Sequence, residues 1–392
     1  MILIAGGGIG GLAAALGLAQ KDIPCTVFEK SETLGEIGAG IQLGPNAFHA
    51  FDALGVGREA RELAVYVDDM RLMDALSGDE IARIPVGDAF HARFGNPYAV
   101  VHRGELHGVL LRACVAHPLI ALRTGAAADR YDLTKDGVSL TLQSGESVEG
   151  RALIGADGLW SSLRAQMVGD AVRVSGHSTY RSVIAADQMP QALRLNSATL
   201  WAGPKCHIVH YPLSGGTSYN LVVTYHNDAP SPVVGLPVDH EEVRRGFTHV
   251  APALRELIDR GQNWRLWVLC DRDPVMTWTD GPVALLGDAA HPMMQYMAQG
   301  ACMALEDAVC LAGELHKGMQ NIANILVRYQ ERRRLRTARV QLQSREMGTH
   351  VYHPEGAHAA LRNSVMGAKT ETEWYDTISW LYGSTGLEGT AI

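Results

Sequence analysis

Residues 1–11 read Met1-Ile2-Leu3-Ile4-Ala5-Gly6-Gly7-Gly8-Ile9-Gly10-Gly11. The apolar run over 1–5 is typical of a buried strand in a parallel sheet, and residues 12–20 (LAAALGLAQ) predict a helix directly after the glycines. In this G-x-G-x-x-G order, Gly6 allows a tight turn, Gly8 lets the backbone approach a pyrophosphate, and Gly11 lets helix and strand pack closely. The stretch therefore predicts a dinucleotide-binding unit that presents a helix N-terminus to phosphate.

A second strand and an acidic residue complete this unit. Residues 25–28 (CTVF) predict the strand, which ends at Glu29, and a carboxylate there can accept hydrogen bonds from the hydroxyls of an adenosine ribose. Ile9 and Gly10 inside the glycine loop, and Lys30 after the acid, are assigned to the same cofactor site. A glycine-rich turn without a ligand is the alternative, but strand, glycines, helix, second strand and acid all occur in the expected order.

Two later runs place an aspartate directly after a predicted strand. Residues 152–158 (ALIGADG) end in Asp157 and Gly158, at the carboxyl edge where open α/β sheets bind ligands. An ordinary strand-to-turn Asp-Gly accounts for this first run equally well. Residues 283–292 (VALLGDAAHP) predict a buried strand closed by Gly287 and Asp288, with Pro292 shaping the turn. Asp288 is suited to bind the ribityl hydroxyls of a flavin, so the second run favours FAD.

A helix expected over 303–315 follows the second run. Residues 299–302 (QGAC) open it, and the N-terminus of the helix near Gly300 and Ala301 can stabilise negative charge on a reduced flavin ring. His291 stands inside the preceding turn, so we expect it to have a structural role and not to act as a general base.

Composition narrows the class of protein. The 392 residues suggest two to three domains, and 47% hydrophobic with 19% charged residues allows a sizeable core. A net charge of −8 argues against a nucleic-acid surface. Six cysteines without a C-x-x-C pair give no zinc or dithiol signature, so no metal site is expected, and they fit a reducing compartment. The chain starts at its first strand and has no apolar run of about 20 residues, so we expect a cytoplasmic enzyme without a membrane span.

The predicted elements indicate an α/β fold with a Rossmann-like FAD-binding domain, an inserted, mainly β substrate domain and a helical C-terminal tail. Strand-like segments dominate residues 174–224, a hairpin is expected over 138–148, and helical patterns prevail from about residue 321. We expect a discontinuous FAD-binding domain over 1–72, 97–172 and 268–345. The substrate domain is expected over 73–96 and 173–267, and the C-terminal helical segment over 346–392.

The three motifs in this order resemble those of the single-component flavoprotein aromatic hydroxylases, the para-hydroxybenzoate hydroxylase superfamily. Residues 38–47 (GAGIQLGPNA) resemble a flavin-proximal loop of that family, which assigns Gln42 to the flavin, and residues 101–107 (VHRGELH) resemble the segment whose arginine, here Arg103, contacts FAD. Residues 201–213, 295–301 and 380–383 are most similar to the 3-hydroxybenzoate 6-hydroxylases. The similarity spans essentially the whole chain.

The resemblance implies a reaction and a substrate site. FAD would be the cofactor and NADH the co-substrate, and O2 would react through a C4a-hydroperoxyflavin to hydroxylate 3-hydroxybenzoate para to its phenol oxygen, giving gentisate. The residues that match the family's substrate site are His207, Tyr211 and Gln295. His207 and Tyr211 are four residues apart, so they lie on one face of the predicted strand. His207, with Gln295, would contact the phenol by hydrogen bonding and proton transfer, and Tyr211 would orient the ring.

Other functions stay open. A sister hydroxylase, salicylate 1-hydroxylase or 6-hydroxynicotinate 3-monooxygenase, would use the same flavin chemistry. A flavin-dependent disulfide reductase is disfavoured because no cysteine pair follows the first unit, whereas a non-catalytic flavin-binding regulator remains an alternative. The expected partners are a small aromatic acid, O2 and NADH, with no nucleic acid; a homodimer is left open, as is the group that binds the substrate carboxylate.

Overall fold

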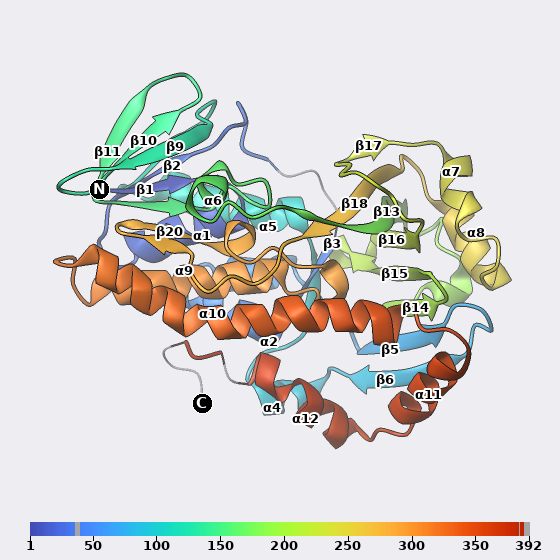
Figure 1. The fold of residues 1–392 in the computed structure, drawn as a ribbon. Helices are drawn as coiled ribbons and strands as arrows, with labels where there is room; N and C mark the ends of the chain where they lie inside the picture. Colours follow the sequence, from blue (N-terminus) through green and yellow to red (C-terminus); the bar gives the residue numbers. More distant parts are fainter. Residues whose placement is uncertain (36–39, 384, 388–392) are drawn as a thin grey trace.

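The computed structural model describes residues 1–35, 40–383 and 385–387. Gly38 and Ala39 of the predicted flavin-proximal loop, and residues 384 and 388–392 of the predicted C-terminal segment, lie outside this part of the chain. Two large sheets lie beside one another, and the long helix α10 (Ile322–Met347) runs across both of them (Figure 1).

The first large sheet is built around the N-terminal strand. β1 (Ile2–Ala5) is fully buried along its length, because Ile2 and Ile4 pack among helices on one face and Leu3 and Ala5 pack in a separate apolar cluster on the other. The strands are parallel except at the β19 edge. In sheet order they are β19 (Thr279–Asp280), β20 (Val283–Leu285), β12 (Ala152–Gly155), β1, β2 (Cys25–Phe28) and β8 (Ile120–Arg123).

Helices cover one face of this sheet, and two of them begin earlier than the sequence pattern predicts. They are α1 (Ile9–Ala19), α5 (Arg103–Ala116) and α9 (Gly300–His316). The predictions began at residues 12 and 303, because apolar periodicity is the signal used and the glycines in these first turns, Gly10, Gly11 and Gly300, carry none. Each of these turns is therefore part of its helix, which brings free backbone N–H groups closer to the end of the adjoining strand.

The second large sheet has eight strands and contains the predicted β insertion. Its pairs are antiparallel except for β5 with β14, which brings residues 69–85 into the sheet formed by residues 173–271. In sheet order the strands are β17 (Leu236–Pro237), β18 (Arg265–Asp271), β13 (Arg173–Ala185), β16 (Ser218–His226), β15 (Cys206–Leu213), β14 (Ser197–Gly203), β5 (Asp69–Asp74) and β6 (Glu80–Pro85).

Side chains alternate across the second sheet and give it one packed face and one cavity face. Tyr180, Ile208 and Val223 pack against α7 (His240–Arg245) and α8 (Pro252–Arg260), the yellow helices at the far right of Figure 1. Their immediate neighbours, Arg181 on β13, His207 and Val209 on β15 and Val222 on β16, line a cavity on the other face.

Smaller elements complete the fold. The predicted hairpin over 138–148 is confirmed as β10 (Val138–Leu142) and β11 (Ser147–Gly150), which with β9 (Ala128–Leu133) form a three-stranded sheet. A second three-stranded sheet contains β3 (Gly40–Leu43), β7 (Ala99–His102) and β4 (Val65–Tyr66). The remaining helices before residue 200 are α2 (Pro45–Ala53), α3 (Gly57–Leu63), α4 (Asp88–Phe94), α6 (Ser162–Met167) and the 3-10 turn η1 (Gln191–Leu193).

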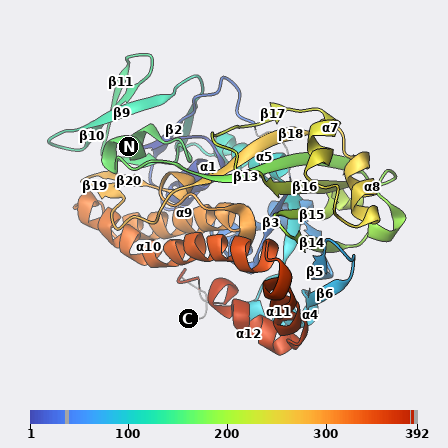
Figure 2. The same ribbon diagram turned by 45° about the vertical axis from the view of Figure 1, so that its right-hand side comes forward.

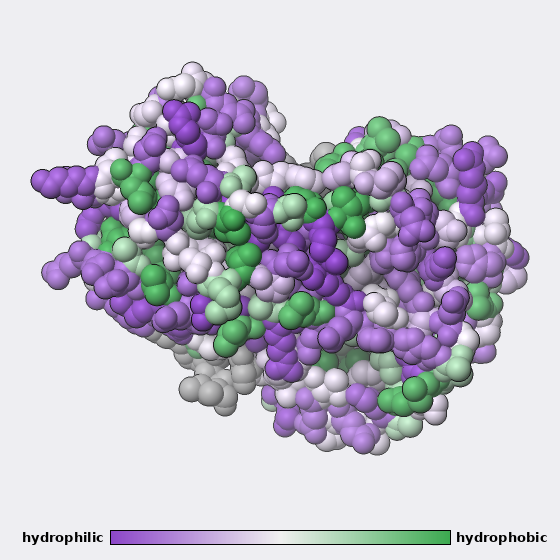
Figure 3. Space-filling view, in the orientation of Figure 1, coloured by the Kyte–Doolittle hydropathy of each residue, from purple (hydrophilic) through white to green (hydrophobic). Residues whose placement is uncertain are grey.

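The helical tail is confirmed, but its first helix crosses the boundary expected at residue 345. α10 continues to Met347 and then into the π-helical turn η5 (Gly348–Tyr352), followed by α11 (Gly356–Gly367) and α12 (Glu371–Tyr382). α9 and α10 lie side by side in both ribbon views (Figures 1 and 2). Among the described residues no helix has the length and apolar character needed to cross a membrane. The face drawn in Figure 3 is a mosaic of hydrophilic residues and small hydrophobic groups.

Candidate active site

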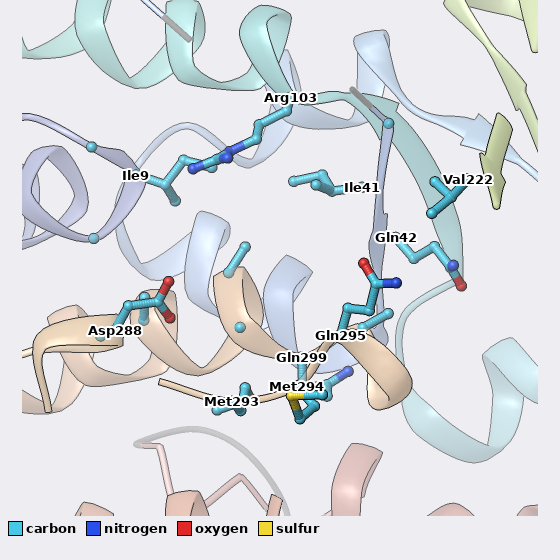
Figure 4. A pocket seen from close by; sticks show the side chains of 18 of the residues that line it. Ile9, Ile41, Gln42, Arg103, Val222, Asp288, Met293, Met294, Gln295 and Gln299 are labelled. Atoms are coloured by element: carbon cyan, nitrogen blue, oxygen red, sulfur yellow. The ribbon is translucent and has the colours of Figure 1, made fainter. Parts of the chain in front are cut away.

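A cavity of about 340 Å3 lies between the two large sheets, within the size range of small-molecule sites. The first sheet contributes its glycine loop and the turn after β20, and the second sheet contributes β13, β15 and β16 (Figure 4). The predicted cofactor and substrate residues that line it come from several distant segments of the chain: Gly8, Gln42, Arg103, His207, Tyr211, Gly287, Asp288, Gln295 and Gly300. Ile9, Gly10 and Ala301 line it as well.

Close backbone contacts explain the glycine loop. Gly6 has φ +109°, and a Cβ on it would lie 2.2 Å from the carbonyl oxygen of Ala156. A Cβ on Gly11 would lie 1.9 Å from the carbonyl oxygen of Gly6. These two glycines therefore hold the loop in shape without lining the cavity, while Gly8, Ile9 and Gly10 line it. This arrangement fits the pyrophosphate of a dinucleotide.

Polar groups continue along the cavity from the glycine loop. Arg103 enters from the start of α5 and Asp288 from the turn η3 (Gly287–Ala289), on opposite sides of the space in Figure 4. The accessible surface of Asp288 faces the cavity, which it lines. Protein surrounds the rest of the side chain, and the resulting desolvation raises the pKa of its carboxyl group. Gly300 and Ala301 add the N-terminus of α9. A ribityl chain and a flavin ring match these donors and acceptors, so the residues present fit FAD.

Besides Gly6 and Gly11, four predicted cofactor residues lie outside the cavity lining: Glu29, Lys30, Asp157 and Pro292. Glu29 accepts hydrogen bonds from the N–H groups of Gly7 (2.7 Å) and Ser31 (2.9 Å), which lower the pKa of its carboxyl group against the effect of burial. It therefore lies at the glycine loop but outside the cavity lining, and Lys30 beside it is exposed.

Asp157 and Pro292 also lie outside the lining. Desolvation raises the pKa of the Asp157 carboxyl group, and hydrogen bonds at the start of α6, led by Ser161, oppose that rise. Its chain neighbours Ala156 and Gly158 line the cavity instead. Pro292 is buried, and its carbonyl oxygen accepts a hydrogen bond from Gln341 Nε2 (3.1 Å). A direct FAD contact by Glu29, Lys30, Asp157 or Pro292 remains a prediction.

The predicted common face of His207 and Tyr211 is confirmed, because both line the cavity from β15 with Val209 between them. Tyr211 lies so close to β3 that a Cβ on Gly40 would be 2.5 Å from its Cε2. Burial raises the pKa of Tyr211, so its hydroxyl stays protonated near neutral pH. A neutral hydroxyl at this place can position an aromatic ring without introducing a charge.

His207 is 1% exposed, and its two ring nitrogens have different surroundings. Nδ1 is 2.8 Å from Nε2 of His353, whereas Nε2 is buried without a hydrogen-bond partner among the described residues. Burial lowers the pKa of His207 well below its ordinary value, and His353 and His177 lower it further. The ring is therefore neutral, and its Nε2 is left without a partner on a side chain that lines the cavity.

Gln295 begins the 3-10 turn η4 (Gln295–Met297) and is held from two sides. Its Oε1 accepts a hydrogen bond from Arg181 Nη2 (2.8 Å), and its Nε2 donates to Thr224 Oγ1 (3.3 Å). Arg181 was missed by sequence reasoning because it stands in the middle of a strand outside every motif. Desolvation lowers its pKa, and no carboxylate among the described residues forms an ion pair with it.

Two further cavity-side residues come from the tail. Tyr352 lines the cavity, and His353 follows it and contacts His207. No sequence signal marked either one, because they lie about 145 residues beyond β15 in the chain. Two tyrosines pack against His207: its ring centroid is 4.8 Å from that of Tyr352 and 5.5 Å from that of Tyr296.

The structural role expected for His291 matches its surroundings. Its Nε2 is 2.5 Å from Asp307 Oδ2, and both side chains are fully buried. Arg333 bonds both Asp307 (2.7 Å) and Glu306 (2.5 Å). Burial alone would raise the pKa of Asp307, but His291 and Arg333 lower it to about 2. This network joins the turn after β20 to α9 and α10 behind the cavity, and no candidate metal cluster occurs among the described residues.

Comparison with known proteins covers nearly the whole chain. Residues 1–344 match the family described as FAD binding domain. The chain is 52% identical over 388 residues to 3-hydroxybenzoate 6-hydroxylase 1 of Aquipseudomonas alcaligenes, which spans 99% of this chain and 98% of that protein. It is 48% identical over 382 residues to 3-hydroxybenzoate 6-hydroxylase of Polaromonas naphthalenivorans strain CJ2, with 97% and 95% covered. The solved structure of Klebsiella pneumoniae HpxO complexed with FAD and uric acid has a TM-score of 0.84 at 26% identity, with 96% and 95% covered.

Proposed function

Since this chain belongs to the FAD binding domain family and is an FAD-dependent monooxygenase, we propose that it hydroxylates 3-hydroxybenzoate para to the phenol oxygen, giving gentisate. The observation that carries the choice of a phenol is the unpartnered Nε2 of His207 on a side chain that lines the cavity. A buried nitrogen without a partner is costly, and a phenol hydroxyl satisfies it by donating a hydrogen bond.

FAD, when bound, supplies electrons to dioxygen and delivers an electrophilic oxygen atom. The glycine loop, Arg103 and Asp288 hold the cofactor, and Glu29 is the residue we assign to its ribose. NADH is the proposed electron donor. The chain has a single G-x-G-x-x-G run, which leaves NADH only a transient docking surface.

The second sheet positions the substrate. His207 accepts the phenol proton, which makes the ring electron-rich, and Tyr211 packs against the ring and excludes water. Arg181, held by Gln295, is the proposed partner of the carboxylate, because a desolvated guanidinium without a counter-ion is stabilised by an incoming anion. The two ends of the substrate are thus recognised by different chemistry.

Product analysis tests the proposed function. The purified protein is supplied with NADH, O2 and separately with 3-hydroxybenzoate, salicylate and 6-hydroxynicotinate, and products are separated by chromatography. Gentisate from 3-hydroxybenzoate as the fastest reaction is expected. Faster turnover of either other compound refutes the substrate assignment, and no oxygen consumption with any of them indicates a flavin-binding regulator.

A further inference from the structure

His207 can accept a phenol proton but does not keep it. Burial and two neighbouring histidines hold its pKa well below the ordinary value, so it cannot retain the proton while oxygen is transferred. A phenol has an ordinary pKa of about 10, and its proton therefore has to leave the site for the phenolate to persist. The side chain that contacts the other nitrogen of His207 decides where the proton goes.

His353 is that side chain. Its Nε2 lies 2.8 Å from His207 Nδ1, and the two rings are stacked with centroids 5.0 Å apart. His353 lies just after η5 and is half-buried, whereas His207 is 1% exposed. A hydrogen bond therefore connects the buried histidine to one that is closer to solvent.

Further histidines continue outward from His353. Its ring centroid is 5.2 Å from that of His177, which in turn is 4.2 Å from that of His226. His226 Nε2 is 3.3 Å from Asp228 Oδ1, and the Asp228 side chain is 89% exposed. His207 is thus buried, His353, His177 and His226 are half-buried, and Asp228 is at the surface.

Several titratable groups surround His353. They are His177 on β13, His207 on β15, His226 on β16, and Tyr296 and Tyr352, which pack their rings against it. Burial lowers the pKa of His353 to about 3, and His177 and His226 contribute to this. Because the low pKa disfavours the doubly protonated ring, His353 takes up a proton at one nitrogen as it releases one from the other, and so passes protons on without storing them.

We propose that His353 relays the phenol proton from His207 to solvent, an inference that rests on the proposed function. First, the phenol O–H bond breaks as an Nε2–H bond forms on His207. Second, the Nδ1–H bond of His207 breaks as an Nε2–H bond forms on His353. Third, the Nδ1–H bond of His353 breaks, and its proton passes to water beside His177 and His226. The phenolate remains in the cavity, and one proton enters solvent. Protonation of the product by the reverse path restores both tautomers.

A purely orienting role is the alternative, and His353→Gln separates the two. Glutamine Oε1 can accept the hydrogen bond of His207 Nδ1–H and so keep its orientation, but an amide does not take up and pass on a proton. We expect unchanged FAD content and an unchanged dissociation constant for 3-hydroxybenzoate, with hydroxylation slowed at least about tenfold near pH 7. The deficit narrows as pH rises toward the phenol pKa, because more substrate then arrives as phenolate.

Proton release gives a readout that does not depend on turnover. A pH indicator in weakly buffered solution reports the proton released when 3-hydroxybenzoate binds the holoenzyme, and this release is expected to be slowed in His353→Gln. The matched control is His350→Gln, because His350 belongs to the same segment but pairs with His358 at the surface (3.3 Å). It is expected to match the wild type in rate, pH profile and proton release.

Chemical rescue covers the case in which His353→Gln fails to fold. In His353→Ala, imidazole is expected to restore hydroxylation and pyrazole, a much weaker base of the same shape, is not; equal effects of the two overturn the relay. A wild-type rate in His353→Gln, or a deficit that does not change with pH, overturns it as well. Failure of the wild type to form gentisate refutes the proposed function, whereas a gentisate-forming wild type with an unaffected His353→Gln refutes the relay alone.

Discussion

His207 and His210 lie on the same strand but on opposite faces, and this makes them a matched pair. His207 lines the cavity, while His210 is fully buried and stacks on Trp201, with ring centroids 6.3 Å apart. We predict that His207→Ala retains FAD and lowers the hydroxylation rate by about 10²–10⁴-fold, with NADH oxidised to hydrogen peroxide in place of product. The measurement is gentisate formed per NADH consumed, alongside flavin content.

His210→Ala is the control for this pair. It is expected to lower stability through lost packing while each folded molecule keeps its coupling. Tight coupling and a near-normal rate in His207→Ala would contradict the assignment of His207 and require another phenol-activating group.

The second prediction for a single residue is that Arg181 binds the substrate carboxylate, because its charge lacks a carboxylate partner among the described residues. In Arg181→Met, the dissociation constant of 3-hydroxybenzoate is expected to rise about 10- to 100-fold, as befits loss of a charged hydrogen bond. That of neutral 3-hydroxybenzamide should change little. Flavin absorbance titrations measure both, and Arg265→Met, at the exposed neighbouring position on β18, is the control. Equal weakening of both ligands would show that Arg181 does not bind the carboxylate.

At the scale of the elements, the buried carboxylate of Glu314 on α9 forms ion pairs with two arginines of α10 and with Lys317. Glu314 is 3% exposed and bonds Lys317 (2.8 Å), Arg328 (3.0 Å) and Arg332 (2.9 Å). Burial alone would raise its pKa, but these three cations lower it from 4.5 to about 2. Its contribution to stability is therefore complete above about pH 4.5 and is lost as pH falls toward 2.

The corresponding prediction is that Glu314→Gln lowers the free energy of unfolding by about 1–3 kcal/mol at pH 7, and that the difference from the wild type shrinks between pH 4.5 and 2. Urea denaturation across this range measures it. Glu331→Gln, exposed on α10, should leave the curve nearly unchanged. A difference that stays constant with pH would mean that the lost stability comes from packing and not from the charge of Glu314.

At the scale of the whole molecule, the cavity is formed by both large sheets and by the tail, from Gly8 to Tyr352. FAD bound there contacts the folded state only, so removing it should lower stability. At a free FAD concentration 100 times its dissociation constant, the expected stabilisation is about 2.7 kcal/mol. Thermal unfolding of the apoprotein at increasing FAD concentration measures it, and a midpoint independent of FAD would contradict the cofactor assignment.

The sequence alone determined those features whose cause is local. The turn after β1 and the strand at 283–285 follow from glycine geometry and apolar runs, and the common face of His207 and Tyr211 follows from the two-residue period of a strand. The apolar pattern did not locate the first turns of α1 and α9, because the glycines in them carry no apolar period, and both helices begin before the residues predicted.

Only the tertiary structure decided which distant residues meet. The parallel pairing of β5 with β14 brings two separate segments into one sheet, and the path of α10 across both sheets returns His353 to His207 from 146 residues away. Arg181 becomes a cavity residue through the face that β13 presents there. Contacts between segments so far apart leave no periodicity or motif in either one, because they arise from the packing of finished elements and not from the chain around each residue.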